Sequence, residues 1–209
     1  MGEMDQYLDH WEKDFSKTLP ANYRDRHPLN IEDEPISAFL SSYNWLDDPF
    51  GLLIMGKAGV GKTWILTAIM NDVLMNCFSW SESMTKHVAY YPTSYLIYLL
   101  RNRDDKVFQN AISVSWLFLD DFGSENVTDF AREHFFTILD IRCQKRKPTF
   151  VSTNLNFNEI GTKYGERFVS RLKEMCIPMV IEGNDKRTEI AKQRAIEFKS
   201  RTSNQQESA

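Results

Sequence analysis

Cysteine is scarce in this chain of 209 residues, which has only Cys77, Cys143 and Cys176. The three are far apart and form no C-x-x-C pair, so neither a disulfide framework nor a zinc site is expected. Free thiols are typical of proteins that stay in the reducing cytosol. We therefore predict a cytoplasmic location.

Long hydrophobic runs are also missing. No stretch reaches the roughly 18 apolar residues of a membrane-spanning helix. The first residues, 1–6, are acidic and polar, unlike a signal peptide. We therefore predict no membrane partner. Hydrophobic residues still make up 42% of the chain, enough to form the core of one domain.

The chain also has no excess of positive charge, because its net charge is −4. The surface as a whole does not attract nucleic acid, so any DNA contact must come from local basic patches. No internal repeat occurs, and the only low-complexity segment is a polar tail after Arg201, which we predict to be disordered.

A glycine loop is present in a specific context. The apolar run 51–55 leads into G-x-x-x-x-G-K-T at 56–63, and residues 62–77 then have the pattern of a helix. Strand, glycine loop and helix in this order predict a phosphate-binding P-loop rather than a simple connecting turn. Its amides and the helix dipole favour an anion. The residues expected to bind the nucleotide here are Gly56, Lys57, Ala58, Gly59, Val60, Gly61, Lys62, Thr63 and Trp64.

The expected cofactors are ATP and Mg²⁺. Lys62 would reach the β- and γ-phosphates, and the Thr63 hydroxyl would hold the metal ion. A second metal ligand follows the apolar strand 115–119, which runs into two acids. Asp120 would hold Mg²⁺ with Thr63, and Asp121 would orient or deprotonate the attacking water. The alternative is an acidic pair at an ordinary strand end.

Asn154 follows another apolar strand, 149–153. The carboxyl ends of parallel strands lie on the ligand side of such a sheet. We predict a catalytic role for Asn154 in sensing the γ-phosphate or holding the lytic water. An ordinary turn residue is the alternative.

The whole pattern predicts an α/β fold with a five-stranded parallel sheet between helices. The expected strands are 51–55, 88–91, 115–119, 149–153 and 177–181, and the expected helices are 62–77, 94–102, 128–146 and 163–175. We predict an N-terminal helical segment and linker over 1–48, an ATPase core over 49–187, and a basic C-terminal helix with a disordered tail over 188–209. Too few residues follow the last strand for a full C-terminal lid domain.

Two features stand out in the N-terminal segment. Tyr7, Leu8, Trp11 and Phe15 would form one apolar helix stripe that docks on the core or binds a partner. Pro35 suits the first turn of a second helix that ends near Tyr43.

These motifs resemble those of the AAA+ ATPases, and more closely the branch of the DnaC/DnaI helicase loaders and the IstB transposition ATPases. The resemblance rests on residues 56–63, 117–125, 148–155 and 164–172, and it extends over roughly 19–187. It implies a homo-oligomer with ATP bound between subunits.

The resemblance also assigns three arginines. Arg171 is implied as the finger that enters the neighbour's ATP site, with Arg167 as the alternative, and Arg187 as the sensor-2 residue at the nucleotide. A guanidinium there would stabilise the charge of phosphoryl transfer. Ion pairs of Arg167 and Arg171 with Glu166 and Glu174 are the simpler interpretation.

Two departures from the family pattern bear on activity. Asp121 stands where many AAA+ proteins carry glutamate, so hydrolysis is expected to be slow or dependent on a partner. The short N-terminal segment lacks the cysteine-rich zinc module of the DnaI type.

Two regions are candidates for DNA contact. A basic cluster at 142–147 could bind DNA or complement the dipole of its helix. The second region combines aromatic and basic side chains that suit stacking on single strands, or core packing. Its members are Tyr90, Tyr91, Tyr95, Tyr98, Arg101 and Arg103.

The sequence thus predicts a helicase loader that binds ATP, single-stranded DNA and a replicative DNA helicase. One alternative is an IstB-like transposition ATPase that binds duplex DNA and recruits a transposase. Another is an ATP-binding adaptor with little turnover.

Overall fold

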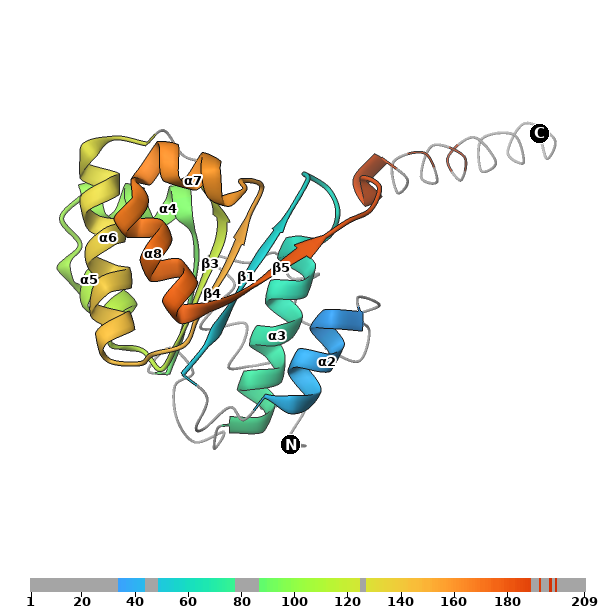
Figure 1. Cartoon of the computed structure of the whole chain (residues 1–209), viewed down its shortest axis with the longest axis horizontal. Helices are drawn as coiled ribbons and strands as arrows, with labels where there is room; N and C mark the ends of the chain where they lie inside the picture. Colours follow the sequence, from blue (N-terminus) through green and yellow to red (C-terminus); the bar gives the residue numbers. More distant parts are fainter. Residues whose placement is uncertain are drawn as a thin grey trace, which may run out of the picture.

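The computed structural model describes residues 34–43, 49–77, 87–124 and 127–188, together with Lys192, Ile196 and Phe198. The apolar stripe predicted over 7–15 and the polar tail lie outside these residues. The described part of the chain begins with helix α2, and at its other end a segment continues beyond the last strand (Figure 1).

A five-stranded, fully parallel sheet organises the described chain, in the order β2-β3-β4-β1-β5. The strands are β1 (Gly51–Gly56), β2 (Val88–Pro92), β3 (Trp116–Phe122), β4 (Thr149–Thr153) and β5 (Cys176–Ile181). The predicted fold class is therefore confirmed. Strand β1 is a nearly continuous apolar run because both of its faces are buried, and β4 is equally buried although it carries three hydroxyl side chains.

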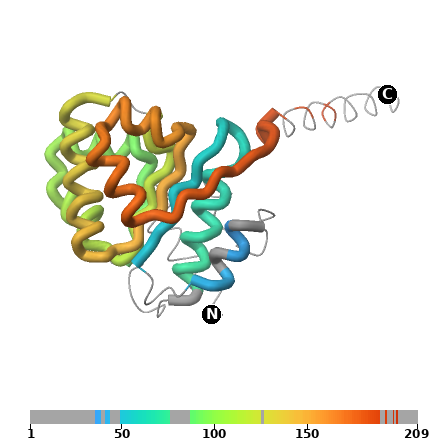
Figure 2. Tube along the Cα trace, viewed as in Figure 1, coloured from blue at the N-terminus to red at the C-terminus, as the bar shows by residue number. Residues whose placement is uncertain are grey.

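Helices cover both faces of the sheet (Figure 1). They are α2 (Glu34–Ser42), α3 (Lys62–Cys77), α4 (Thr93–Arg101), α5 (Asp105–Ser113), α6 (Asp129–Gln144), α7 (Phe157–Tyr164) and α8 (Glu166–Met175). One hydrophobic cluster packs α2 and α3 against one face of the sheet. A second cluster packs α4, α5, α6, α7 and α8 against the opposite face. The chain trace in Figure 2 shows that β5 lies beside β1, although the two strands are far apart in the sequence.

Two helices were missed by the sequence prediction. Helix α5 begins after Asp104, whose side chain accepts a hydrogen bond from the Val107 amide. Helix α7 begins with a reciprocal capping box between Asn156 and Glu159. The single helix expected over 163–175 is in fact the end of α7 and all of α8. The helix is interrupted at Gly165, whose φ is 93°.

Arg142 is the largest side chain that is fully buried. Its guanidinium donates hydrogen bonds of 2.7–3.2 Å to the Thr149 hydroxyl and to the carbonyl oxygens of Ala111, Val114, Ser115 and Pro148. Burial lowers the pKa of Arg142 to about 9, so the side chain is still charged at neutral pH. Arg142 therefore fastens the α5–β3 connection to the start of β4. A DNA contact by this member of the basic cluster is excluded because the side chain is inaccessible.

We expect Arg142→Met to lower the free energy of unfolding by about 3 kcal/mol or more, because buried carbonyl oxygens lose their donor. Urea unfolding followed by circular dichroism measures the loss. Lys145→Met is the matched control, an exposed cation three residues along the same segment. The control should stay within about 0.5 kcal/mol of the wild type. Equal stability of the two variants would contradict a structural role for Arg142.

Candidate active site

The predicted P-loop connects β1 to α3, and its glycines take conformations that other residues avoid. Gly59 and Gly61 have φ values of 82° and 104°, in the left-handed region. A Cβ atom on Gly59 would lie 2.0 Å from the Asp185 carboxylate. Both glycines are therefore required for the loop to fold against its surroundings.

The other predicted loop residues divide by exposure. Lys57 and Ala58 are exposed on the loop, whereas Val60 is buried in the cluster around α3. Trp64 is partly buried against the same cluster. Gly56 ends β1, and a Cβ there would meet the Ile181 carbonyl at 2.5 Å. The loop backbone thus carries no side chain at Gly56, Gly59 and Gly61, while Lys57 and Ala58 are exposed.

Lys62 is almost completely buried, with 5% of its surface exposed. Its ammonium donates hydrogen bonds to the carbonyl oxygens of Gly56 at 2.9 Å and Lys57 at 2.8 Å, and to Oδ1 of Asn154 at 2.6 Å. Burial lowers the pKa of Lys62, and the nearby Asp121 and Asp120 partly offset that effect. Two predicted catalytic residues that are 92 positions apart are thus in direct contact.

Asp120 and Thr63, the predicted metal ligands, are also in contact. The Thr63 hydroxyl donates to Oδ1 of Asp120 at 3.1 Å, and the Tyr90 hydroxyl donates to Oδ2 at 2.7 Å. Hydroxyl and carboxylate oxygens suit Mg²⁺. Among the described residues no group of three His, Cys, Asp or Glu side chains could hold a metal ion. Mg²⁺ bound at Thr63 and Asp120 would take its other ligands from phosphate oxygens and water, as it usually does.

Asp121 is exposed and has a φ of 54°, which is unusual for a residue other than glycine. Partial burial and the carboxylate of Asp120 raise the pKa of Asp121, while Lys62 and Arg187 lower it. These influences place its carboxylate among the charges of the P-loop. The geometry suits a group that contacts water beside a bound phosphate.

The segment after β5 closes the other side of the P-loop. The Lys186 amide donates to the Gly59 carbonyl at 3.1 Å, and the Arg187 amide donates to the Asp185 carboxylate at 2.9 Å. Arg187 is exposed, and its charge acts on both Lys62 and Asp121. The predicted sensor-2 residue is thus close to the site.

Arg171 is engaged elsewhere within the chain. Its guanidinium forms ion pairs of 2.7 Å with Asp140 of α6 and with Glu174 of α8. The guanidinium of Arg167 instead lies 5.1 Å from the centre of the Phe136 ring. The pair with Glu174 agrees with the simpler interpretation of Arg171, and the finger role, which concerns a neighbouring subunit, stays a prediction.

Sequence reasoning missed several residues that shape the site. Tyr90 was assigned only to the core or to DNA, yet its hydroxyl binds Asp120. Ser152 was taken only as part of a strand, yet its hydroxyl contacts both acids. Asp185 and Lys186 carried no recognisable motif. Their roles depend on which strands are neighbours, and a local pattern does not give that information.

Comparison with known proteins now identifies the family. The profile of the IstB-like ATP binding proteins matches residues 29–189. The chain belongs to this family. Its members are ATP-binding proteins of the AAA+ class, so the predicted AAA+ branch is confirmed.

Two relatives, a helicase loader and an insertion-sequence protein, correspond to the first two functions considered from the sequence. The replicative helicase loader DnaI of Bacillus subtilis is 27% identical over 169 residues, which cover 73% of this chain and 52% of DnaI. The putative ATP-binding protein of insertion sequence IS1162 from Pseudomonas fluorescens is 28% identical over 133 residues, covering 61% of this chain and 54% of that protein. This member of the IstB-like family thus spans about half the length of the relatives it matches.

Solved structures agree on the fold. The DnaC helicase loader aligns with a TM-score of 0.65 at 23% identity, covering 78% of this chain and 99% of that one. The DnaI structure aligns with a TM-score of 0.66 at 20% identity, covering 80% and 93%. In the described part of this IstB-like protein, no helix is both long and apolar enough to cross a bilayer.

We expect Asp121→Asn to raise the stability of the nucleotide-free protein at pH 7. The pKa of Asp121 is raised in the folded protein. Ionisation of its carboxylate therefore lowers the free energy of unfolding as the pH rises through that pKa. Well below 3.8, the value in the unfolded chain, the carboxyl is protonated in both states and has no such effect. The gain should be roughly 0.5 kcal/mol or less, because the residue is exposed and screened. Urea unfolding across pH 4–8 measures it. A gain that grows toward acid pH would contradict this assignment.

Proposed function

We propose that this chain is an ATPase that loads a replicative DNA helicase, with single-stranded DNA and ATP·Mg²⁺ as its ligands and a homo-oligomer as its active form. The observation that carries the proposal is the contact of Lys62 with Asn154 beside the Thr63–Asp120 pair. These four groups come from the P-loop and from the ends of β3 and β4. Such an arrangement suits the γ-phosphate of a nucleoside triphosphate.

Each residue has a distinct task in this proposal. Lys62 binds phosphate oxygens in place of its present neutral partners, and Asn154, released from Lys62, holds the γ-phosphate or the water. Thr63 and Asp120 hold Mg²⁺, which neutralises charge on the phosphates. Asp121 orients the attacking water, and its raised pKa makes it a better proton acceptor than an ordinary aspartate.

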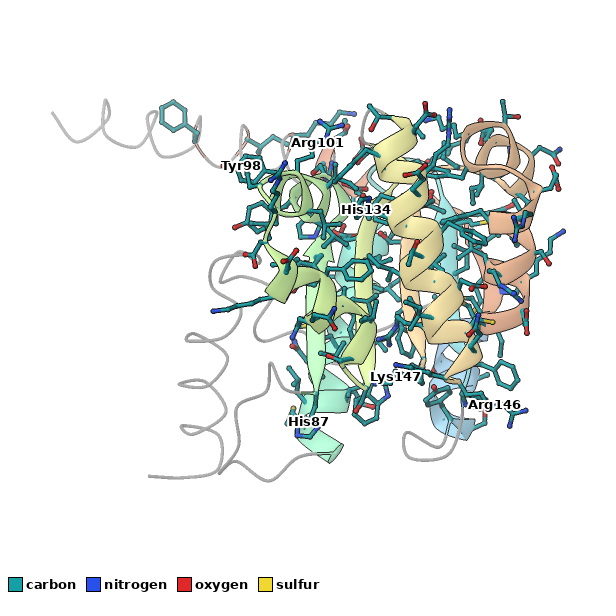
Figure 3. All side chains as sticks on the ribbon, turned by 90° about the vertical axis from the view of Figure 1, so that its left-hand side faces the viewer. His87, Tyr98, Arg101, His134, Arg146 and Lys147 are labelled. Carbon is teal, nitrogen blue, oxygen red and sulfur yellow. The ribbon has the colours of Figure 1, made fainter. Side chains whose placement is uncertain are left out.

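The proposed DNA contact lies on α4. Tyr95 and Tyr98 stack on each other with ring centres 6.1 Å apart, and they are 38% and 61% exposed. In Figure 3, Tyr98 and Arg101 lie at one end of the domain, whereas Arg146 and Lys147 lie at the opposite end. Exposed aromatic rings beside arginine suit single-stranded bases, because every base has a face that can stack.

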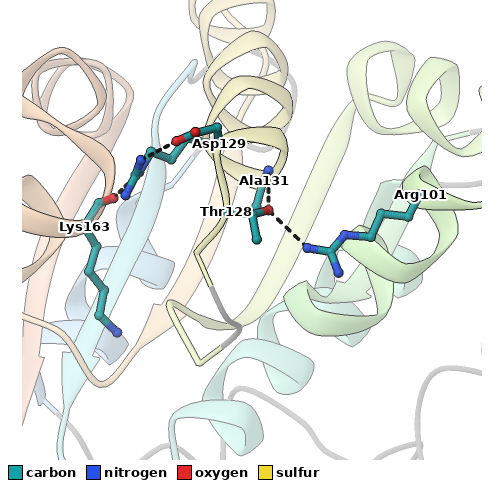
Figure 4. Close-up of polar contacts among 6 residues, drawn as sticks. Arg101, Thr128, Asp129, Ala131 and Lys163 are labelled. Atoms are coloured by element: carbon teal, nitrogen blue, oxygen red, sulfur yellow. Dashed lines mark hydrogen bonds and ion pairs between the residues drawn. The ribbon is translucent and has the colours of Figure 1, made fainter.

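Arg101 also ties α4 to the neighbouring elements. It donates to the Thr128 hydroxyl at 3.1 Å, and Thr128 in turn caps α6 by accepting from the Ala131 amide (Figure 4). At the start of the same helix, Arg132 bridges Asp129 and the Lys163 carbonyl. The end of α4, the helix that carries the tyrosines, is therefore linked to the start of α6.

Relatives support the function only in its general form. The similarity to DnaI favours helicase loading, and the similarity to the IS1162 protein favours a transposition ATPase that binds duplex DNA and recruits a transposase. Asp121, shorter than the usual glutamate, leaves an ATP-binding adaptor with little turnover as the third candidate. We favour loading because the stacked tyrosine pair suits single strands.

We expect ATP to promote binding of single-stranded DNA, and hydrolysis to reverse it, because only the γ-phosphate can link Lys62, Asn154 and a neighbour's arginine. Fluorescence anisotropy of labelled single- and double-stranded oligonucleotides with ATP, ADP or a slow analogue measures this across a salt series. Tyr98→Ala should weaken single-strand binding by roughly tenfold, and Tyr98→Phe, which keeps the ring, should not.

Lys62→Ala should remove the effect of ATP in the same assay. Binding that does not depend on the nucleotide would contradict the switch. A clear preference for duplex DNA would favour the transposition ATPase instead.

We expect Arg171→Ala to bind ATP but to hydrolyse it slowly, because the finger would act on the neighbour's site. Fingers supplied in trans are worth roughly 10³–10⁵ in rate. Mixing this variant with Asp121→Asn should restore some turnover, since each subunit supplies what the other lacks. Asp140→Asn is the control, because it breaks an Arg171 ion pair and keeps the arginine. Without rescue at any mixing ratio, Arg171 would be only a structural ion pair.

A further inference from the structure

The end of β3 contains one residue more than the strand beside it. Leu119 pairs with Val151 and Phe122 with Thr153, so Asp120 and Asp121 together face the single residue Ser152 of β4. This is a β-bulge, and bulges beside active sites commonly redirect a side chain.

The bulge decides where Asp121 lies. In a regular strand, consecutive side chains point to opposite faces of the sheet, so Asp121 would enter the hydrophobic cluster formed with α4 to α8. Leu119 and Phe122 both belong to that cluster, although they are three positions apart. The extra residue lets Phe122 return to the cluster and leaves Asp121 exposed beside the P-loop charges.

Asp121 must adopt a strained backbone to occupy this position. Its φ of 54° brings Cβ close to the following carbonyl group, and aspartate tolerates this better than most residues but not as well as glycine. Such a conformation persists only where the surroundings hold it.

Two sides of Asp121 are held: its carbonyl accepts from the Thr93 hydroxyl at 3.0 Å and from the Ser124 amide at 3.1 Å, and its amide is held by Ser152, which also contacts Asp120. The Oγ of Ser152 accepts a hydrogen bond from the Asp121 amide at 2.9 Å and donates its proton to the Asp120 carboxylate. The two roles are compatible because a serine hydroxyl has one proton and two lone pairs. Ser152 is fully buried, so both of its hydrogen bonds lie inside the protein.

The next residue of β4 closes the bulge from the other side. The Thr153 hydroxyl donates to the Phe122 carbonyl at 2.7 Å and accepts from the Leu155 amide at 3.0 Å. Phe122 is therefore fixed independently, and Ser152 is left as the β4 side chain that contacts both Asp120 and Asp121.

We propose that Ser152 is a positioning residue for hydrolysis, which fixes Asp121 relative to Asp120 through the bulge. This inference rests on the proposed ATPase function, in which Asp121 orients water and Asp120 holds the metal ion. Ser152 does not reach the nucleotide in this assignment. Its loss should therefore change turnover and leave binding in place.

The first experiment separates turnover from binding. Ser152→Ala should lower kcat for ATP by roughly tenfold or more while the Kd for ATP·Mg²⁺ changes less than about threefold, because Lys62 and Thr63 remain. Thr149→Val is the control, since it removes another buried β4 hydroxyl at the opposite end of the strand, where it accepts from Arg142 and any loss is one of stability. The control should keep its kcat. An unchanged kcat in folded Ser152→Ala, or an equal loss of kcat and affinity, would overturn the proposal.

A second experiment needs no turnover, so it distinguishes failure of this inference from failure of the ATPase function. Glycine adopts positive φ freely, so Asp121→Gly should make the bulge independent of Ser152. Ser152→Ala should lower the urea midpoint of unfolding in the wild type, and by half as much or less in the Asp121→Gly background.

Equal midpoint shifts in the two backgrounds would overturn the proposal even if the wild type hydrolyses ATP. If Ser152→Ala alone does not fold, recovery of folding in the double variant supports it, and failure of both variants to fold contradicts it.

Discussion

The buried carboxylate of Asp120 has to be supplied with hydrogen-bond donors, because an unpaired charge in a protein interior is very unfavourable. Three hydroxyl groups meet this need: those of Thr63 from α3, Tyr90 from β2 and Ser152 from β4. Each donor lies on a different element. Satisfying one charge therefore fixes the P-loop helix and two strands around a common point, and the other groups of the site are arranged about it.

The strand order explains why so few residues suffice. Since β4 lies between β3 and β1, the residues that follow β3 and β4 end beside the P-loop that follows β1. All the strands are parallel, so their carboxyl ends share one edge of the sheet. Lys62 and Asn154 meet there without any long loop. At the amino ends of β3 and β4, Arg142 donates to neutral carbonyl oxygens instead. The two ends of these strands are therefore stabilised by different chemistry.

Much of this arrangement could be predicted from the sequence, and the omissions have physical causes. The strands were predictable because two-sided burial leaves continuous apolar runs, and α3 was predicted with its observed bounds, 62–77. Helix α5 was missed although Val107, Phe108, Ala111 and Ile112 have helical spacing, and Gly165 was not recognised as a helix break. Lys62, Thr63, Asp120, Asp121 and Asn154 were predictable because their motifs are local. The bulge, the donor role of Tyr90 and the hydrogen bond from Lys186 to Gly59 depend on contacts between distant segments, so no local pattern reveals them.

The state of Lys62 bears on how a nucleotide would change this site. In the structure its ammonium donates to two carbonyl groups and to Asn154, so its hydrogen bonds are all made within the protein. A phosphate that takes Lys62 must also free Asn154, because the two share one hydrogen bond. In the exchange, ammonium bonds to neutral oxygens are replaced by bonds to phosphate oxygens, in which donor and acceptor are both ionised. A ligand with no γ-phosphate would leave Asn154 without a new partner. In the proposed ATPase, the Lys62–Asn154 contact would therefore be the physical basis for distinguishing a triphosphate from a diphosphate.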